Sequence, residues 1–210
     1  MKPLRIALTK GRLERNTVAL FDRMGLDTSA LKEKGRRLIL PCSDMEVVLA
    51  KSADVITYIR HGVCDIGVVG KDTIMEYGGS YYEMLDLSLG VCKFVLAGRD
   101  PDFFGGYATK TVATKYPHVA HRFFEDKGMD VNIIRIDGSV ELAPLLGLAD
   151  AIVDIVETGT TLKENGLSII EDISRVSARV IVNVAALNMR RKEIDTLIDQ
   201  LQTAIGEEPS

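Results

Sequence analysis

An apolar strand that leads into two carboxylates and a threonine–glycine loop is the most informative feature of this sequence. Asp154 and Glu157 belong to the end of the apolar run Ala151–Val156 and the turn after it, and the loop Thr158–Thr161 follows directly. Open α/β sheets bind ligands where strands end in such loops. Gly159 allows the backbone to approach a ligand closely, and small threonines leave several N–H and O–H groups free to meet one anion. The loop is therefore predicted to form a cup for a phosphate monoester.

The two carboxylates are predicted to bind the sugar that carries this phosphate. A carboxylate repels phosphate, but it accepts hydrogen bonds from the hydroxyl groups of a ribose. Asp154 and Glu157, together with Thr158–Thr161, therefore predict a 5-phosphoribosyl site. The alternative is a polar turn after a strand, in which the threonine side chains cap backbone groups. The pattern is not the Walker phosphate loop, because no Gly-Lys-Ser or Gly-Lys-Thr closes it.

Basic residues near the N-terminus could neutralise a second, larger anion. Lys10 and Arg12 flank Gly11 directly after the first apolar run, and such a turn can hold a diphosphate against the backbone. Arg36 and Arg37 precede another apolar run. The alternative for Lys10–Arg12 is a solvated basic turn, and the alternative for Arg36 and Arg37 is a pair of surface arginines. The residue types do not decide between these alternatives and anion binding.

Composition and charge exclude several other classes. The 210 residues carry a formal net charge of −4 without a basic run, so nucleic-acid binding is not favoured. No signal peptide is evident, and no apolar run approaches the roughly 18 residues of a membrane helix. The three cysteines show no C-x-x-C spacing, which favours buried free thiols in a reducing cytoplasm. His61, His118 and His121 do not form metal-ligand spacings, and no Ser-His-Asp order stands out.

Alternating strands and helices must position these residues. Apolar runs predict strands, and amphipathic segments with Gly or Pro at their ends predict helices. The predicted strands are Leu4–Leu8, Leu38–Leu40, Glu46–Ala50, Asp65–Val69, Met84–Leu89, Lys93–Ala97, Thr111–Thr114, Asn132–Ile136, Ala151–Val156, Leu167–Ile173 and Val180–Val184. The predicted helices are Asn16–Met24, Ala53–His61 with Ser52 as N-cap, one opening at Gly70–Asp72, one beginning at Pro117, Val140–Leu146 and Arg190–Ile205. This alternation predicts an α/β fold whose first sheet is mostly parallel.

Several separated motifs, in one order along nearly the whole chain, resemble the ATP phosphoribosyltransferase family. The main signature consists of Glu141, Gly147, Ala149, Ile152, Val153, Asp154, Glu157, Thr158, Gly159, Thr161 and Leu162. Further similar segments are Lys10–Leu13, Asp65–Asp72, Val112–Pro117 and Gly138–Pro144. Separate motifs in a common order are much more specific than any one of them.

The resemblance implies an enzyme of the first step of histidine biosynthesis. It would transfer the phosphoribosyl group of 5-phosphoribosyl 1-pyrophosphate (PRPP) to N1 of ATP and release pyrophosphate. The implied PRPP-binding residues are Glu141, Asp154, Glu157, Thr158, Gly159, Thr160 and Thr161. The implied catalytic residues at the diphosphate are Arg36, Arg12 and Lys10, and the implied ATP-binding residues are Gly11, Gly70 and Lys71. Mg²⁺ would be carried by the diphosphate, without a ligand from the protein itself.

The resemblance also implies a fold and a partner. The expected fold is similar to that of type II periplasmic binding proteins, with two small α/β lobes around a central cleft. Lobe I would comprise residues 1–90 plus 176–210, and lobe II would comprise residues 91–175 with the phosphate loop. Because the sequence ends soon after Arg190–Ile205, it resembles the short form of the family. That form implies a hetero-oligomer with a regulatory subunit related to histidyl-tRNA synthetase, and self-association besides.

Two other functions remain open. A cytoplasmic small-molecule-sensing domain of the binding-protein type would share the two lobes, but it would not need a loop that combines carboxylates with Thr-Gly-x-Thr. A phosphoribosyltransferase acting on another base usually has two adjacent acidic residues before its phosphate loop, whereas Asp154 and Glu157 are three positions apart.

Overall fold

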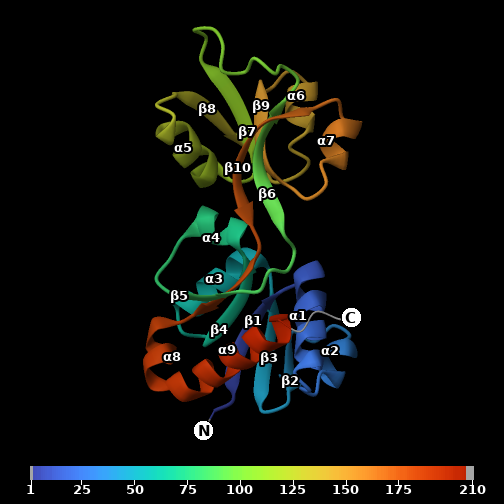
Figure 1. Cartoon of the computed structure of the whole chain (residues 1–210), viewed down its shortest axis with the longest axis vertical. Coiled ribbons are helices and arrows are strands. Elements are labelled where there is room, and N and C mark those ends of the chain that lie inside the picture. Colours follow the sequence, from blue (N-terminus) through green and yellow to red (C-terminus); the bar gives the residue numbers. More distant parts are fainter. Residues whose placement is uncertain (1, 207–210) are drawn as a thin grey trace. The chain divides into compact units, whose positions relative to one another are not determined.

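The computed structural model describes residues 2–206, which form two compact units (Figure 1). Unit 1 comprises Met1–Gly90 and Ser177–Ser210, and unit 2 comprises Val91–Val176. Residue 1 and residues 207–210 lie outside the described part of the chain. Unit 1 is therefore built from both ends of the sequence, and unit 2 is inserted between them. Each unit has its own β-sheet with helices packed against it.

Strands and helices alternate over parts of the chain. The strands are β1 Leu4–Thr9, β2 Ile39–Cys42, β3 Met45–Ala50, β4 Ile66–Gly70, β5 Tyr82–Asp86, β6 Cys92–Gly98, β7 Lys110–Thr114, β8 Val131–Arg135, β9 Ala151–Val156, β10 Ser168–Val176 and β11 Ala178–Val182. The helices are α1 Arg12–Arg23, α2 Ser29–Lys32, α3 Ser52–Arg60, α4 Lys71–Tyr77, α5 Pro117–Asp126, α6 Leu142–Leu145, α7 Thr160–Glu164, α8 Val184–Met189 and α9 Arg191–Gly206. The strands β2-β3, β5-β6-β7 and β10-β11 follow one another without a helix between them. None of the helices within residues 2–206 is long and apolar enough to cross a membrane.

The sheet of unit 1 has the strand order β2-β3-β1-β4-β11-β5 and is mixed. Strand β1 pairs in parallel with β3 and β4, whereas the β2–β3, β4–β11 and β11–β5 pairs are antiparallel. The prediction of a mostly parallel sheet is therefore wrong. Only two residues, Ser43 and Asp44, separate β2 from β3, and so short a connection forms a hairpin, which is antiparallel.

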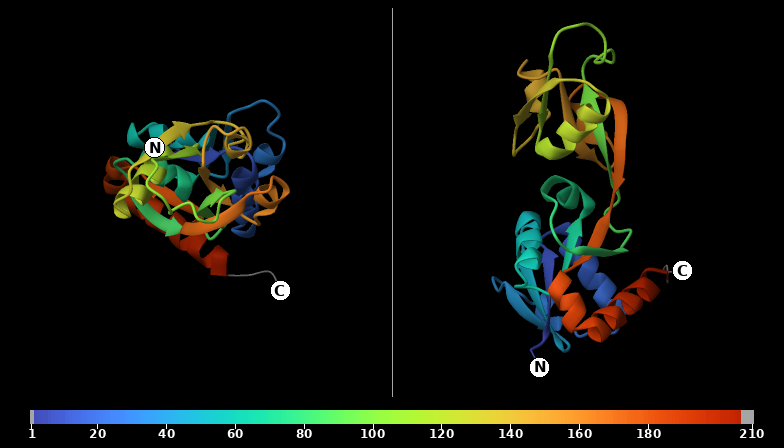
Figure 2. Two further views of the ribbon diagram at one scale, coloured as in Figure 1. Left: turned by 90° about the horizontal axis from the view of Figure 1, so that it is seen from above. Right: turned by 90° about the vertical axis from the view of Figure 1, so that its left-hand side faces the viewer.

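The central strands of unit 1 are buried on both faces, because helices cover both sides of the sheet (Figure 2). Successive side chains of a strand point to opposite faces. Ile6 and Leu8 of β1 pack with residues of α1 and α9 on one face, while Ala7 packs with residues of α3 on the other. The predicted amphipathic helix at the C-terminal end is confirmed, since Ile194, Leu197, Ile198 and Leu201 of α9 are all buried. This two-sided core fixes the strand ends from which the polar loops of unit 1 project.

The sheet of unit 2 has the strand order β10-β6-β9-β7-β8, and β9 lies at its centre. Strand β9 pairs in parallel with β7 and antiparallel with β6. The predicted strand Ala151–Val156 is confirmed with the same bounds. One face of this sheet packs against α6 and α7 through Val95, Ile152 and Leu162, among others. The strand that precedes the threonine loop is therefore held by neighbours on both sides and by the core beneath it.

Several helix ends differ from the predictions. Ser52 is not the N-cap of α3, because Lys51 occupies that position and Ser52 is the first helical residue. The strand predicted for Val180–Val184 ends at Val182, and Asn183 caps α8 by accepting a hydrogen bond from the N–H of Ala186. The short helices α2, α7 and α8 have too few residues to show a helical periodicity, so the pattern did not reveal them.

Candidate functional site

The threonine loop of unit 2 forms a tight turn at the end of β9. Gly159 has the left-handed backbone angles φ 79° and ψ 2°, and α7 begins at the next residue. Oγ1 of Thr158 lies 3.0 Å from Oγ1 of Thr160, so the two hydroxyl groups meet across the glycine. The buried side chains of Val156 and Leu162 fix the two ends of the loop in the core. The sequence therefore produces this turn locally, from a glycine between two apolar anchors.

A pocket of about 210 Å³ opens at this loop. Its lining brings together all seven residues that the resemblance implies for the phosphoribosyl donor, and it also includes three apolar neighbours. The lining residues are Glu141, Asp154, Ile155, Val156, Glu157, Thr158, Gly159, Thr160, Thr161 and Leu162. The hydroxyl groups of the loop can donate hydrogen bonds to an anion, whereas the carboxylates can accept them from hydroxyl groups of a ligand. The pocket thus has both parts of the chemistry that a sugar phosphate requires.

Glu141 reaches this pocket from a different part of unit 2. It immediately precedes α6, as the N-cap residue, and it is half-buried. Asp154 is also half-buried and lies opposite Val95 of β6 in the sheet, whereas Glu157 is exposed. The three carboxylates therefore differ in their exposure to water although they line one pocket.

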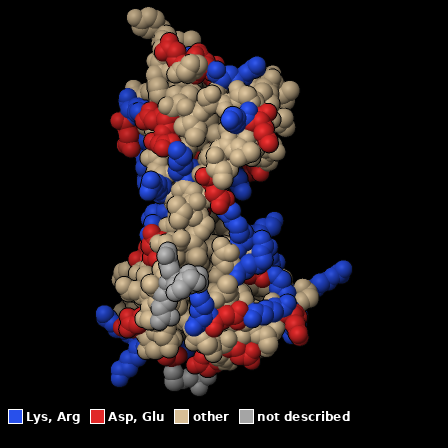
Figure 3. Space-filling view, turned by 45° about the vertical axis from the view of Figure 1, so that its right-hand side comes forward, with Lys and Arg blue, Asp and Glu red and all other residues tan. Residues whose placement is uncertain are grey.

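A second pocket, of about 570 Å³, lies in unit 1 beside the turn after β1. It combines charged groups from α1 and α2 with an apolar wall. The lining residues are Lys10, Gly11, Glu14, Arg15, Val18, Ala19, Asp22, Leu31, Lys32 and Lys34. Lys and Arg side chains gather on the side of unit 1 that carries α1 and α2 (Figure 3). Of the residues that the sequence singles out for an anion, Lys10 and Gly11 line this pocket, whereas Arg12 and Arg36 do not.

The structure distinguishes Arg36, which the resemblance implies as catalytic, from its neighbour Arg37. Nε of Arg37 donates a hydrogen bond to the carbonyl of Lys34 at 3.2 Å, and its Nη2 donates to the carbonyl of Glu33 at 2.9 Å. Arg36 is exposed, and its guanidinium has no hydrogen bond or ion pair within residues 2–206. Arg37 therefore closes its own loop, while Arg36 remains available for a ligand.

Two adjacent parallel strands place the predicted ATP-binding residues at one edge of the sheet of unit 1. Strands β1 and β4 are paired, so the turn at Gly11 and the start of α4 at Lys71 follow their carboxyl ends. Nζ of Lys71 lies 2.5 Å from Oε2 of Glu83. A Cβ atom at Gly70 would come within 2.0 Å of the Asp72 carboxylate, so a larger residue here would displace the Asp72 side chain.

Two charged groups of unit 1 that sequence reasoning missed hold the predicted ones in place. Glu14 is buried in α1, accepts a hydrogen bond from the N–H of Gly11 and forms an ion pair with Lys34. Glu83 in β5 binds Lys71. The signal for Glu14 was its position as the third residue of a helix, where a glutamate often caps the preceding backbone. Nothing local indicated Glu83.

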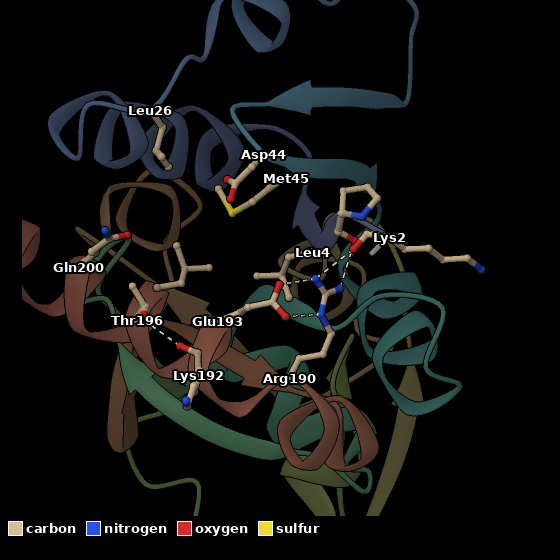
Figure 4. A pocket seen from close by; sticks show the side chains of 12 residues that line it. Lys2, Leu4, Leu26, Asp44, Met45, Arg190, Lys192, Glu193, Thr196 and Gln200 are labelled. Carbon is tan, nitrogen blue, oxygen red and sulfur yellow. Dashed lines mark hydrogen bonds and ion pairs between the residues drawn. The ribbon is translucent and has the colours of Figure 1, made fainter.

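A third pocket, also of about 570 Å³, is lined by residues from both ends of the sequence of unit 1 (Figure 4). One of its charged residues, Arg190, is fully engaged by the protein. Its guanidinium donates hydrogen bonds to Asp65, Glu193 and the carbonyls of Pro3 and Lys2. This arginine therefore anchors the N-terminal segment to α9, and we assign it a structural role.

No group of three or more His, Cys, Asp or Glu side chains within residues 2–206 is arranged to hold a metal ion. Cys42 and Cys64 are free thiols in the core of unit 1, and burial raises the pKa of each thiol to about 11. Such thiols stay protonated near neutral pH and are unsuited to act as nucleophiles or metal ligands.

The chain is similar to known proteins over nearly its whole length. Residues 51–203 match the family model described as HisG: ATP phosphoribosyltransferase. The chain is 57% identical over 211 residues to an ATP phosphoribosyltransferase of Listeria monocytogenes serotype 4a, covering 99% of both chains. It is 35% identical to a chain in the solved ATP phosphoribosyl transferase (HisG:HisZ) complex from Thermotoga maritima, with a TM-score of 0.84, covering 98% of this chain and 100% of that one. The fold also matches the periplasmic aliphatic sulphonate binding protein SsuA of Escherichia coli at 11% identity and a TM-score of 0.62, covering 98% and 69% of the two chains.

Proposed function

The chain belongs to the ATP phosphoribosyltransferase family, the pentosyltransferases that join PRPP and ATP in histidine biosynthesis, and we propose how its residues divide this reaction between them. The C1–oxygen bond to pyrophosphate breaks, the electron pair leaves with pyrophosphate, and N1 of adenine forms the new bond to C1. The protein must orient two anionic substrates and stabilise the charge on the leaving group. Orientation of reactants can contribute roughly 7–11 kcal/mol to such a reaction.

The threonine loop binds the 5′-phosphate of PRPP in this proposal. Thr158, Thr160 and Thr161 donate hydrogen bonds from hydroxyl and backbone groups, and Gly159 keeps the approach open. Asp154, Glu157 and Glu141 accept hydrogen bonds from the ribose hydroxyls. The observation that carries the proposal is the single pocket of about 210 Å³ that all seven residues line. An anion in this pocket without hydroxyl groups would meet three carboxylates, so the pocket suits a sugar phosphate better than free phosphate.

Lys10, Arg12 and Arg36 stabilise the diphosphate as its negative charge grows. Charged groups that are oriented in advance towards a developing charge lower the barrier most effectively. Arg36 supports this assignment because its guanidinium is exposed and without a partner within residues 2–206, while Arg37 is held by two carbonyl groups. Arg36 is therefore our choice for the residue that acts at the leaving pyrophosphate.

ATP binds at the edge of the unit 1 sheet in this proposal, near Gly11, Gly70 and Lys71. The support is the parallel pairing of β1 with β4, which brings the loops after both strands to one edge. Enzymes of this family need a divalent metal ion. We propose that it is Mg²⁺ and that it arrives on the diphosphate of PRPP, as part of the substrate, because the described residues offer it no cluster of ligands.

A regulatory subunit related to histidyl-tRNA synthetase completes the active enzyme in this proposal, as a hetero-oligomer of the short-form type. The support is the similarity, over 98% of this chain, to a chain in the Thermotoga maritima HisG:HisZ complex. We also propose self-association of the catalytic chain and a cytoplasmic location, which the free buried thiols favour.

The test is an assay that follows the absorbance of phosphoribosyl-ATP with ATP, PRPP and Mg²⁺. We expect weak activity from the chain alone, strong activity with the regulatory subunit, and inhibition of the complex by histidine. Folded protein without product under both conditions would contradict the proposed substrates. Full, histidine-sensitive activity from the chain alone would contradict the proposed partner.

A further inference from the structure

A single buried carboxylate connects the two cationic segments of unit 1. Glu14 has only 4% of its surface exposed. Its Oε2 accepts a hydrogen bond from the N–H of Gly11 at 3.2 Å, and its Oε1 forms an ion pair with Nζ of Lys34. Gly11 belongs to the turn after β1, whereas Lys34 begins the loop that carries Arg36. The two segments are about twenty residues apart in sequence, and Glu14 bonds to both.

The loop that carries Arg36 is held on both sides of that residue. Before it, Lys34 is bound to Glu14 through its ammonium group. After it, the guanidinium of Arg37 closes the loop by donating to the carbonyls of Glu33 and Lys34. The side chain of Arg36 makes no hydrogen bond or ion pair within the described part of the chain, so the contacts of its neighbours hold its backbone.

Burial makes this link stronger than an ordinary surface ion pair. The side chain of Glu14 is 5% exposed and that of Lys34 is 38% exposed. A buried carboxylate without a partner is strongly destabilising, so the pair stays formed. Exposed pairs, by contrast, contribute little and exchange freely with water. Both carboxylate oxygens of Glu14 are already used by the protein, which leaves Glu14 poorly suited to bind a substrate itself.

We propose that Glu14 is a positioning residue that holds the turn at Lys10–Arg12 and the loop at Arg36 in a fixed arrangement, so that both segments meet the diphosphate of PRPP together. The inference rests on the proposed function, which assigns these cationic residues to the diphosphate. Glu14 then acts through Arg36, so replacing Glu14 should mainly slow the step in which pyrophosphate leaves. It also neutralises Lys34, so the turn and the loop are joined without adding a net charge beside the substrate.

The kinetic test combines variants of Glu14 with Arg36→Ala in the complete enzyme. Glu14→Ala is expected to lower kcat by about 10- to 100-fold, because small displacements of catalytic groups have effects of this size. Glu14→Gln, which keeps an acceptor for Gly11, should recover part of this loss. In the Arg36→Ala background, Glu14→Ala should lower kcat by less than about threefold further, since residues that act together are not additive.

Glu46→Ala provides a matched control. Nε of Arg5 lies 2.5 Å from Oε2 of Glu46, so this variant also removes a glutamate that is bonded to a basic residue of unit 1. Arg5 and Glu46 lie at the opposite end of β1 and β3 from the proposed site. We expect kcat to remain unchanged in this variant. An equal loss from Glu14→Ala in both backgrounds would overturn the proposal, and so would an unchanged kcat in Glu14→Ala alone.

A second measurement tests the link without relying on activity. Amide hydrogen exchange is compared in the wild type, Glu14→Ala and Lys34→Met. Because Glu14 joins the two segments, both variants should speed exchange at residues 10–12 and at residues 33–37. If Lys34→Met left exchange at residues 10–12 unchanged, the inference would be overturned. An unchanged kcat in Arg36→Ala, with faster exchange in both segments, would instead reject the proposed role of Arg36 and leave the link itself supported.

Discussion

Nζ of Lys71 lies 2.5 Å from Oε2 of Glu83, and Oε1 of the same carboxylate lies 3.5 Å from Nε of Arg179. One carboxylate is therefore shared by two cations beside the proposed ATP site. Lys71→Met should raise the KM for ATP by about tenfold, the effect of losing one charge-assisted hydrogen bond. Glu83→Gln should lower that KM by about two- to fivefold, because it frees the ammonium group for the phosphates.

Steady-state kinetics with ATP as the varied substrate measures both effects. Lys93→Met is the control, because Lys93 forms a comparable ion pair with Asp172, 2.7 Å long, in unit 2. It should leave the KM for ATP unchanged. A larger effect of Lys71→Met on the KM for PRPP than on the KM for ATP would assign Lys71 to the PRPP site instead.

Gly159 is expected to be irreplaceable for binding of PRPP. Gly159→Val adds a side chain to a left-handed residue, φ 79°, that lines the pocket of unit 2. The KM for PRPP should rise about 10- to 100-fold, which corresponds to losing one or two hydrogen bonds to a charged group. The effect is measured with PRPP as the varied substrate.

Gly166→Val separates this effect from backbone strain. Gly166 also has a positive φ, 66°, and open space around its Cα, but it does not line the pocket. We expect it to lower stability without changing the KM for PRPP. Equal KM values for PRPP in Gly159→Val and Gly166→Val would contradict the proposal that the threonine loop binds the 5′-phosphate.

Arg36 and Arg37 should behave differently when replaced by alanine. Arg36→Ala is expected to lower kcat about 100-fold, the usual effect of removing one group that stabilises developing charge. Arg37→Ala removes two hydrogen bonds within the loop, so its effect on kcat should be smaller and should appear partly as lower stability. Arg122→Ala in unit 2 controls for the change in net charge. A larger loss of kcat in Arg37→Ala would transfer the role to that residue.

Arg190 is expected to stabilise unit 1 without affecting the reaction. Its guanidinium binds Glu193 and the carbonyls of Pro3 and Lys2 (Figure 4). It also binds Asp65 at 3.2 Å. Arg190→Ala should lower the free energy of unfolding by about 1–3 kcal/mol in urea denaturation, because the partly buried Asp65 loses its charged partner and keeps only the N–H of Arg5. The kcat of the folded enzyme should be unchanged.

The neighbouring Arg191 is the matched control, since its side chain is 77% exposed and pairs with Asp195 one turn along α9. Arg191→Ala should cost about 0.5 kcal/mol or less. The hydrogen bond from Arg190 lowers the pKa of Glu193 below its ordinary value of 4.5. The stability from this pair is therefore present above about pH 4.5 and is lost as the pH falls. The difference between wild type and Arg190→Ala should shrink in acid; a constant difference would contradict the assigned contacts.

The cysteines should differ in reactivity towards a disulfide reagent. Burial raises the pKa of Cys42 and Cys64 to about 11, whereas Cys92 is partly exposed. At pH 8 only about one in a thousand of a thiol with that pKa is ionised, and the thiolate is the reactive form. Native protein should therefore react quickly with one equivalent of reagent. Cys92→Ser should abolish this fast phase of the reaction. A fast phase that survived in Cys92→Ser would contradict the burial of the other two.

The sequence alone determined the parts of the site that are local. Strand β9 with Asp154, the following Glu157 and the glycine between threonines lie within eleven residues, and apolar residues on either side anchor them. Their pattern predicted the strand with its observed bounds. The amphipathic spacing of α9 likewise predicted which of its residues are buried. Short-range forces decide such features, because each residue of the pattern interacts mainly with its near neighbours in sequence.

Only the tertiary structure decided which distant residues meet. It placed β11 between β4 and β5, about a hundred residues away in sequence, and so made the sheet mixed. It bound the guanidinium of Arg37 to two backbone carbonyls and left that of Arg36 exposed. It also joined Glu14 to Lys34. These pairings depend on long-range packing, in which many residues of the chain compete for each partner. The residue types near a position in the sequence do not indicate which distant residue it will contact. The charged partners of the site could therefore be identified only in the folded chain.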